Sequence, residues 1–423
     1  MHVVAVLFMA TSLATAAQAD GAPPADSPPS GPLAEAKTIL ATEDWKAAAN
    51  AFLKFLRKQP GAPEAAEATF WTGYSLVKAG DFEQAIQMLR PFESGGAGGL
   101  EDDKWADDAL LQLGHAYQGT GEADEALECW KRLVEKYPTS VWRNETLLNI
   151  VSLLYSSGNF ADCFPYCERV MKEITDPNAT WETRYTGAYC LNALRQFDEA
   201  EQWIDRWFDP MNALDEAWRT VLGAQRQFLE ATPNKGLQAI ESLQRDFTDL
   251  EAGQWLDVLL RSSMILRQND RAEVARSMLV AAVPRLAGQP DYQIHAVLDE
   301  LAAVIGSDKP QECLDELARL TDLESTPPTA RVLIRERRVD GLRNSERSRE
   351  AAEWLQRALE QEQAEFPRFR AAMLLSEVLA NDLNDREAAV KLLDELLPTL
   401  KRRDFSRGVR ERLQEYRAAA GGK

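Results

Sequence analysis

Apolar residues recur along the chain at the spacing of a helix face, in short segments separated by polar turns. Ala126, Trp130 and Leu133 are three or four residues apart, so their side chains fall on one face of a helix. Pro138 follows and predicts the end of that helix. The preceding segment has the same spacing at Leu110, Leu113, Gly114 and Tyr117. Because no stretch alternates with the two-residue period of a strand, we expect an all-α fold.

A small residue marks one point of this pattern and recurs every 36 to 41 residues. The mean interval of about 38 residues has room for two helices of about 14 residues and two short turns. A small side chain at each marker lets the two helices of a pair pack closely. The ten markers are Ala48, Ala85, Ala126, Cys163, Ala200, Ala239, Ala275, Cys313, Ala351 and Ala389. They predict an α-solenoid of about ten antiparallel helix pairs.

One block of this pattern is similar to a known repeat family. It consists of Leu113-Gly114-x-x-Tyr117, Gly121, Ala126, Trp130, Leu133 and Pro138. The block resembles the tetratricopeptide repeat, which spaces the same residue types in this way. The resemblance implies a right-handed α-solenoid with a concave groove that is lined by the first helix of each pair. It implies a protein or peptide partner in that groove.

A second likeness concerns the joints between helix pairs. Tyr137-Pro138-Thr139-Ser140 resembles the joints of bacterial envelope tetratricopeptide proteins. That group includes the lipoprotein of the outer-membrane barrel assembly machine and the periplasmic coordinator that works with the Tol–Pal system. This likeness implies protein binding at the cell envelope.

The strength of the pattern divides the chain into regions. Residues 33–210 carry the clear repeats, and residues 211–398 keep only the period and the small marker. Residues 399–423 are interpreted as a capping helix with a tail. The pattern weakens between Pro210 and Leu214, where we expect a hinge.

The first residues are typical of an export signal. Val3 to Ala14 form an apolar run too short to span a membrane, and Ala17-Gln18-Ala19 fits the pattern that precedes signal-peptidase cleavage. We expect a signal peptide at residues 1–19, cleaved after Ala19, and a disordered Pro-rich leader at residues 20–32. No cysteine lies near the cleavage point to carry a lipid anchor. The alternative is a frayed apolar end on a cytosolic protein, but the pattern favours a periplasmic or secreted protein without a transmembrane segment.

The family resemblance also points to groove residues. In tetratricopeptide arrays the positions fifteen and eleven residues before the small marker usually face the groove. Aromatic rings in successive repeats would then hold a peptide by apolar contact. The alternative is that these rings pack between neighbouring first helices. The candidates are Phe70, Tyr74, Leu111, His115, Ser152, Tyr185 and Tyr189, with Tyr155 one helical turn beyond Ser152.

Three cysteines fall on adjacent predicted helices. Cys163 and Cys167 lie four residues apart on one face of a second helix, and Cys190 lies on the next first helix. In an exported protein Cys190 could form a disulfide with either of the other two. The alternative is that all three are buried small hydrophobic residues, as free cysteine usually is.

The net charge and the absence of known motifs argue against several functions. The chain has 67 acidic and 48 basic residues, a net charge of −19, which argues against nucleic-acid binding. With three histidines and no phosphate loop, G-x-S-x-G or H-E-x-x-H motif, we expect no catalytic residues, no metal site and no cofactor. Acidic pairs such as Asp107-Asp108 are not interpreted as catalytic, and the loop from Glu93 to Asp103 is expected to be solvated.

These features predict an exported, non-catalytic scaffold that binds envelope proteins through its concave face. Two alternatives stay open. The chain could be an accessory helical subunit of a cell-wall-acting enzyme complex, or a structural array that assembles with itself.

Overall fold

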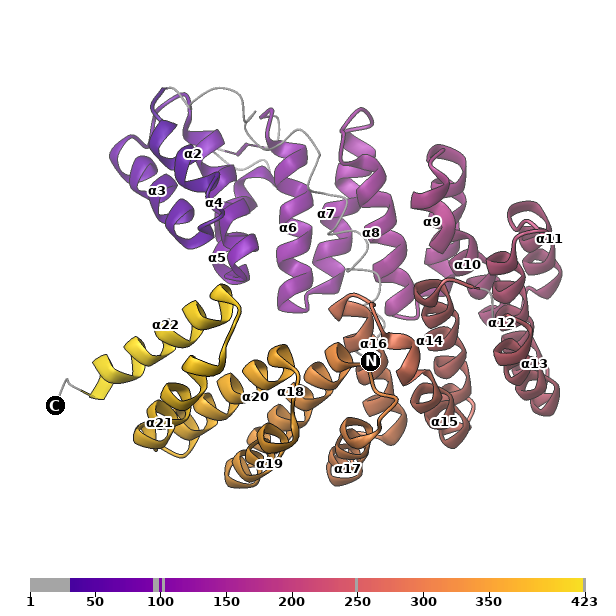
Figure 1. Ribbon diagram of the computed structural model, residues 1–423. Helices are drawn as coiled ribbons and strands as arrows, with labels where there is room; N and C mark the ends of the chain where they lie inside the picture. The colour runs from indigo at the N-terminus through magenta and orange to yellow at the C-terminus, as the bar shows by residue number, and fades with distance from the viewer. Residues whose placement is uncertain (1–30, 94–98, 101–102, 248–249, 421–423) are drawn as a thin grey trace. The chain divides into compact units, whose positions relative to one another are not determined.

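The described part of the chain is helical throughout. The computed structural model describes residues 31–93, 99–100, 103–247 and 250–420, so the predicted signal peptide and nearly all of the leader lie outside the described residues. In the described ranges there are 21 α-helices, labelled α2 to α22, and no β-strand (Figure 1). The predicted all-α fold is therefore confirmed.

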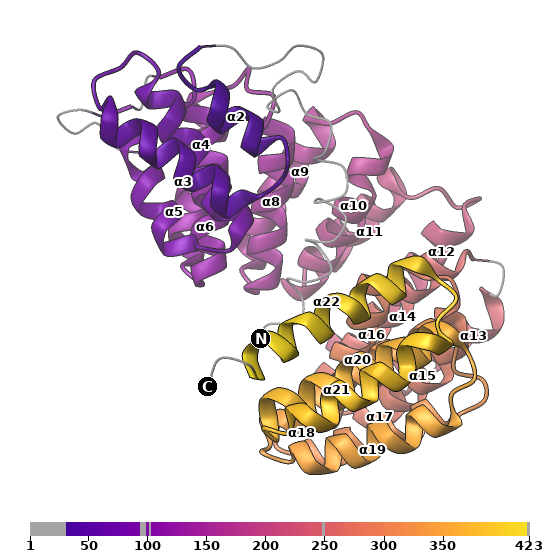
Figure 2. The same ribbon diagram turned by 60° about the vertical axis from the view of Figure 1, so that its left-hand side comes forward.

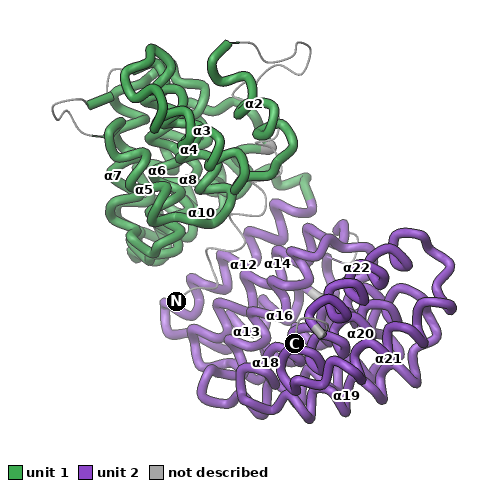
Figure 3. The backbone as a smooth tube through the Cα atoms, turned by 90° about the vertical axis from the view of Figure 1, so that its left-hand side faces the viewer, with its two compact units in different colours: residues 1–212 green, residues 213–423 purple. Residues whose placement is uncertain are grey.

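The chain divides into two compact units, residues 1–212 and 213–423 (Figure 3). The boundary lies inside the segment 210–214, where the sequence pattern weakens. Unit 1 contains α2 (Ala34–Leu40), α3 (Trp45–Lys58), α4 (Ala65–Ala79), α5 (Phe82–Leu89), α6 (Ala106–Thr120), α7 (Ala123–Lys136), α8 (Arg143–Ser156), α9 (Phe160–Glu173), α10 (Pro177–Ala193) and α11 (Phe197–Trp207). Unit 2 contains α12 (Ala213–Leu229), α13 (Pro233–Asp246), α14 (Ala252–Gln268), α15 (Ala272–Ala282), α16 (Asp291–Ile305), α17 (Pro310–Asp322), α18 (Pro328–Asn344), α19 (Ser348–Gln361), α20 (Glu365–Glu377), α21 (Arg386–Leu396) and α22 (Arg403–Ala420).

The helices form antiparallel pairs in chain order, from α2 with α3 to α20 with α21, and α22 follows the last pair (Figures 1 and 2). Within each unit a helix packs on the next one, and first helices such as α4 and α6 also pack on each other. All ten sequence markers lie in the second helix of a pair. The prediction of sequential antiparallel pairs is confirmed.

Most of the markers are buried where two helices meet, as their small size predicts. The exceptions are Ala239 and Cys313, which are only partly buried. In α13 the buried small residue is Gly236, where a Cβ atom would lie 2.9 Å from the ring of Phe228. The small contact residue of α13 is therefore Gly236, three residues before the predicted Ala239, because the sequence around Gly236 lacks the usual turn residue and aromatic.

Two kinds of glycine shape the clear repeats of unit 1. Gly80 and Gly121 end α4 and α6 in the left-handed region, with φ of 79° and 84°, which glycine adopts without strain. Gly73 and Gly114 instead admit a large side chain from the second helix. A Cβ atom at Gly114 would lie 2.1 Å from the indole nitrogen of Trp130, a fully buried ring.

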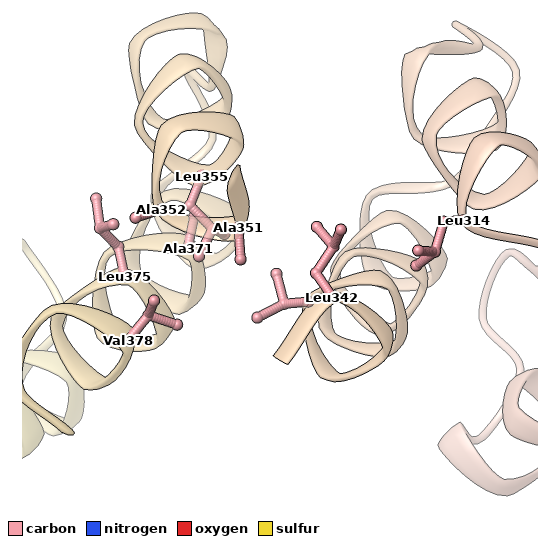
Figure 4. Close-up of a cluster of buried hydrophobic side chains, with 9 residues drawn as sticks. Leu314, Leu342, Ala351, Ala352, Leu355, Ala371, Leu375 and Val378 are labelled. Atoms are coloured by element: carbon pink, nitrogen blue, oxygen red, sulfur yellow. The ribbon is translucent and has the colours of Figure 1, made fainter. Parts of the chain in front are cut away.

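In unit 2 the last helix pairs share apolar clusters. One cluster joins α17, α18, α19 and α20 through side chains that include Leu314, Leu342, Leu355 and Leu375 (Figure 4). A second cluster places Val409, Leu413 and Tyr416 of α22 against α20 and α21. The final helix thus covers apolar surface that α21 would otherwise expose. None of the helices in the described ranges has the length and apolar character needed to span a membrane.

Candidate partner-binding site

The predicted groove residues all lie on first helices of unit 1, namely α4, α6, α8 and α10. Five of them are at most 8% exposed: Phe70, Leu111, Tyr155, Tyr185 and Tyr189. The other three, Tyr74, His115 and Ser152, are partly exposed. Because a buried side chain offers little surface to a partner, the first five pack the repeats together, as the alternative interpretation expects. Partner contact through Tyr74, His115 and Ser152 stays a prediction.

The rings of α4 belong to an aromatic cluster. Phe70 stacks on Trp105, with ring centroids 5.0 Å apart and planes 14° apart, and Trp71 meets Trp105 edge to face at 5.7 Å. Tyr74 packs edge to face on Trp71 at 5.4 Å and on Trp45 at 6.1 Å. The cluster joins α3, α4 and the start of α6, so it fixes the orientation of Tyr74 on the partly exposed face.

A second aromatic group joins α8 to α10. The ring of Tyr155 meets that of Tyr189 edge to face at 5.2 Å, and Phe160 at the start of α9 lies 5.6 Å from Tyr189. Both tyrosines are nearly fully buried. This group therefore holds neighbouring repeats in register rather than facing a partner.

Contacts between a basic and an acidic side chain link consecutive first helices on this face. Two such contacts occur, from α2 to α4 and from α6 to α8. In each, the basic residue lies eleven positions before a small marker, and the glutamate is the third residue of the next first helix. Lys37 Nζ lies 2.6 Å from Glu67 Oε1, and His115 Nε2 lies 3.9 Å from Glu145 Oε1. Sequence reasoning missed both glutamates, although counting positions within each repeat could have found them.

The contact between α4 and α6 differs from these two pairs. Where they have Lys37 or His115, α4 has Tyr74, and the third residue of α6 is Asp108. The indole nitrogen of Trp142, at the start of α8, donates a hydrogen bond to Asp108 Oδ1 at 2.8 Å. The pKa of Asp108 is raised to about 6, mainly by burial; the Trp142 hydrogen bond lowers this pKa, and the neighbouring charge of Asp107 raises it. Asp108 is thus partly buried, and its carboxylate accepts a hydrogen bond within unit 1.

The three cysteines meet where α9 packs on α10. The sulfur atoms of Cys163 and Cys167 are 3.9 Å apart, and the thiol of Cys190 is within hydrogen-bond reach of both. All three side chains are fully buried and present as free thiols. Burial raises the pKa of Cys167, which keeps this thiol protonated. The sequence correctly anticipated that the three would lie together, and the disulfide stays a prediction.

The described residues include no group of three or more His, Cys, Asp or Glu side chains arranged to hold a metal ion. The face formed by α4, α6 and α8 instead presents one phenol, one imidazole, one hydroxyl and several carboxylates. Such an arrangement can bind a peptide by ring contact and hydrogen bonds.

Comparisons with known proteins agree with the repeat pattern. Models of the tetratricopeptide repeat match residues 33–90 and 108–140, both in unit 1. No curated protein sequence matches the chain. Tetratricopeptide repeats generally mediate protein–protein interactions and typically carry no catalytic function.

Several solved structures are similar to parts of this chain. The C-terminal part of a repeat-containing protein from Cytophaga hutchinsonii is 15% identical, with a TM-score of 0.41, over 62% of this chain and 98% of that one. A structure of Naa15/Naa10 bound to HypK-THB is 12% identical, with a TM-score of 0.37, over 87% of this chain and 58% of that one. The TPR domain of P58(IPK) is 16% identical, with a TM-score of 0.24, over 88% and 99%. Two segments of unit 1, residues 33–90 and 108–140, thus match the tetratricopeptide repeat, and the described helices of both units form sequential antiparallel pairs.

Proposed function

We propose that this chain is an exported scaffold that binds protein partners at the bacterial cell envelope through the first helices of unit 1. The observation that carries the proposal is the set of partly exposed side chains at equivalent positions of α4, α6 and α8, which are Tyr74, His115 and Ser152. They belong to successive repeats, two of which lie within matched segments. A peptide that crosses these helices would meet one of them in each repeat.

Peptide selection against the full chain tests partner binding. Ligands would be selected from a displayed peptide library, and their affinities would be measured by calorimetry for the wild type, Tyr74→Ala and His115→Ala. We expect each variant to weaken binding by tenfold or more, about 1.4 kcal/mol, because partly exposed aromatic side chains often dominate peptide recognition. Tyr189→Ala is unsuitable here, because Tyr189 is buried and its loss would alter folding.

Glu125→Ala is the matched control, since Glu125 is an exposed residue on α7, the second helix of a pair. Equal weakening by Glu125→Ala, or unchanged binding by Tyr74→Ala and His115→Ala, would remove the first-helix face as the binding site. Thermal unfolding of each variant establishes that the fold is intact.

Export rests on the sequence of the first 19 residues and needs its own test. The full chain, tagged at its C-terminus, would be expressed in a bacterium and recovered from the periplasm and the medium. We expect a mature protein that begins at Asp20. An uncleaved chain that stays in the cytoplasm would contradict export.

A further inference from the structure

A small pocket opens in unit 1 where α6 begins and the connection from α7 to α8 passes. Its volume is about 360 Å³, which is near the lower end for ligand pockets, roughly 300–1,000 Å³. The size suits one side chain of a partner better than a whole cofactor. The lining includes Trp105, Asp107, Asp108, Tyr137, Val141 and Trp142.

Contacts within unit 1 fix the side chains that form the walls of this pocket. Trp105 stacks on Phe70, and the indole of Trp142 is hydrogen-bonded to Asp108. At the rim, Val141 is 74% exposed and adds apolar surface beside the aromatic walls. The pocket is thus a preformed aromatic site with an apolar rim. Because its walls are already ordered, a partner side chain would bind there with little loss of conformational entropy in this protein.

The two carboxylates of the pocket lack a cation. Within the described ranges, no Lys, Arg or His nitrogen lies within 4.0 Å of Asp107 or Asp108, whereas the equivalent Glu67 and Glu145 have Lys37 and His115. The nearby Lys104 places its ammonium over the Trp105 ring, 5.2 Å from the centroid.

An acidic residue in the first turn of a helix is stabilised by the helix dipole, by about 0.3–1 kcal/mol. That effect alone does not explain the missing cation. Glu67 and Glu145 occupy the same third helix position in α4 and α8, and each still has a basic partner in the chain. Asp108 is also partly buried between aromatic rings, where an unpaired carboxylate is costly.

We propose that this pocket receives an arginine side chain of a partner protein, which supplies the cation that Tyr74 does not. Arginine fits better than lysine, because a planar guanidinium stacks on indole rings and can bond two carboxylates at once. The guanidinium would lie against Trp105 and Trp142 and donate hydrogen bonds to Asp107 and Asp108. The inference rests on the proposed function only in taking the occupant to be a protein.

Short peptides test the pocket directly on the full chain. The probes are acetyl-Gly-Arg-Gly-amide, the lysine equivalent, and the citrulline equivalent, which keeps the shape of arginine without its charge. Binding is followed by NMR through the indole N–H resonances of Trp105 and Trp142, which lie in the pocket wall. We expect saturable shifts in the ~1 mM range with arginine, at least threefold weaker binding with lysine, and no saturation with citrulline.

Variants separate the pocket from general charge effects. Asp108→Asn keeps an oxygen that can accept the Trp142 hydrogen bond but removes the charge, and we expect at least tenfold weaker arginine binding. Asp107→Asn is a second variant on the same wall, in case the first disturbs folding. Glu67→Gln is the matched control, because it occupies the same helix position but its carboxylate already has Lys37.

Several outcomes would overturn the proposal. They are equal binding of the citrulline or lysine peptide, an equal loss in Glu67→Gln, and the absence of saturation with the arginine peptide. If selected peptides still lost affinity in His115→Ala after such a result, the first-helix face would stand and only the arginine pocket would fall.

Discussion

The two units join their repeats in different ways. In unit 1 large side chains close over glycines, as Trp130 does over Gly114 and Trp203 over Gly187. In unit 2 buried glutamates join neighbouring pairs: Glu300, 1% exposed, accepts hydrogen bonds from Arg267 at 3.1 and 3.2 Å, and Glu316 of α17 pairs with Arg276 of α15.

This difference explains where the family is recognisable. A tetratricopeptide pattern records glycine, tyrosine, alanine and an aromatic at fixed positions, and unit 1 has these residues. Unit 2 keeps the helix pairs and some glycine contacts, such as Gly236 with Phe228, but adds buried ion pairs, such as Arg267 with Glu300 at 3.1 Å. One architecture is thus stabilised by two chemistries, and they respond differently to mutation and pH.

The largest effect is expected when the close contact of unit 1 is overfilled. In Gly114→Ala the new methyl group would lie 2.1 Å from Trp130, which must move although it is fully buried. We expect a loss of about 3 kcal/mol in the free energy of unfolding, measured by denaturant titration. Gly223→Ala is the control, because no atom lies within 4 Å of its Cβ position in α12. A neutral Gly114→Ala would show that unit 1 does not depend on this contact.

The next effect breaks an ion pair of unit 2. Glu300→Ala removes the partner of Arg267, whose side chain is 30% exposed and can regain some hydration. We therefore expect a loss of about 2 kcal/mol, below the cost of stranding a fully buried charge. Glu411→Ala is the control, since the Arg407–Glu411 pair is 75% and 70% exposed and should contribute almost nothing. Similar losses of unfolding free energy in Glu300→Ala and Glu411→Ala would contradict the distinction between buried and exposed ion pairs.

A smaller effect of opposite sign is expected at Asp108. Its pKa in the folded chain, about 6, lies above the usual aspartate value of 3.8, so folding disfavours the charged form. The protonated form of Asp108 therefore favours folding. Its contribution to the free energy of unfolding is fully present below about pH 4 and is lost as the pH rises through about 6. Asp108→Asn should be more stable than the wild type by about 1 kcal/mol at pH 8, after allowance for partial exposure, and equally stable at pH 3. A destabilised variant at pH 8 would contradict the account of an uncompensated carboxylate.

The smallest effect is a change in arginine affinity with pH. The charged or titratable groups around the pocket are Asp107 and Asp108 on α6, Lys104 before it, and Tyr137 after α7. Because Asp108 loses its charge below about pH 6, the arginine peptide should bind several-fold more weakly at pH 5 than at pH 8. Asp108→Asn should reduce this dependence. An affinity that rises toward low pH would contradict the role of the carboxylate.

The fold could be predicted because its signals are local. Turn glycines, terminal prolines and small markers each specify a helix end or a close contact within one repeat, as Gly121, Pro138 and Ala126 do. The exception at Ala239 arose where Gly236 carries the contact without the usual neighbours.

The candidate site was only partly predictable, because its chemistry spans two repeats. Phe70 and Leu111 have the spacing of groove residues, yet both are buried; Phe70 stacks on Trp105, 35 positions later. The same holds for the unpaired Asp108, which stands out only when Lys37–Glu67 and His115–Glu145 are aligned with it. Contacts of this kind can be predicted only when the register between neighbouring helices is known.

Hydrogen exchange with mass spectrometry would test the central claim, that partners bind to the first helices of unit 1. The full chain would be compared with and without a selected peptide at saturating concentration. We predict slower amide exchange in α4, α6 and α8, with little change in the second helices α5, α7 and α9 or in unit 2. Protection confined to the second helices or to unit 2 would contradict the account.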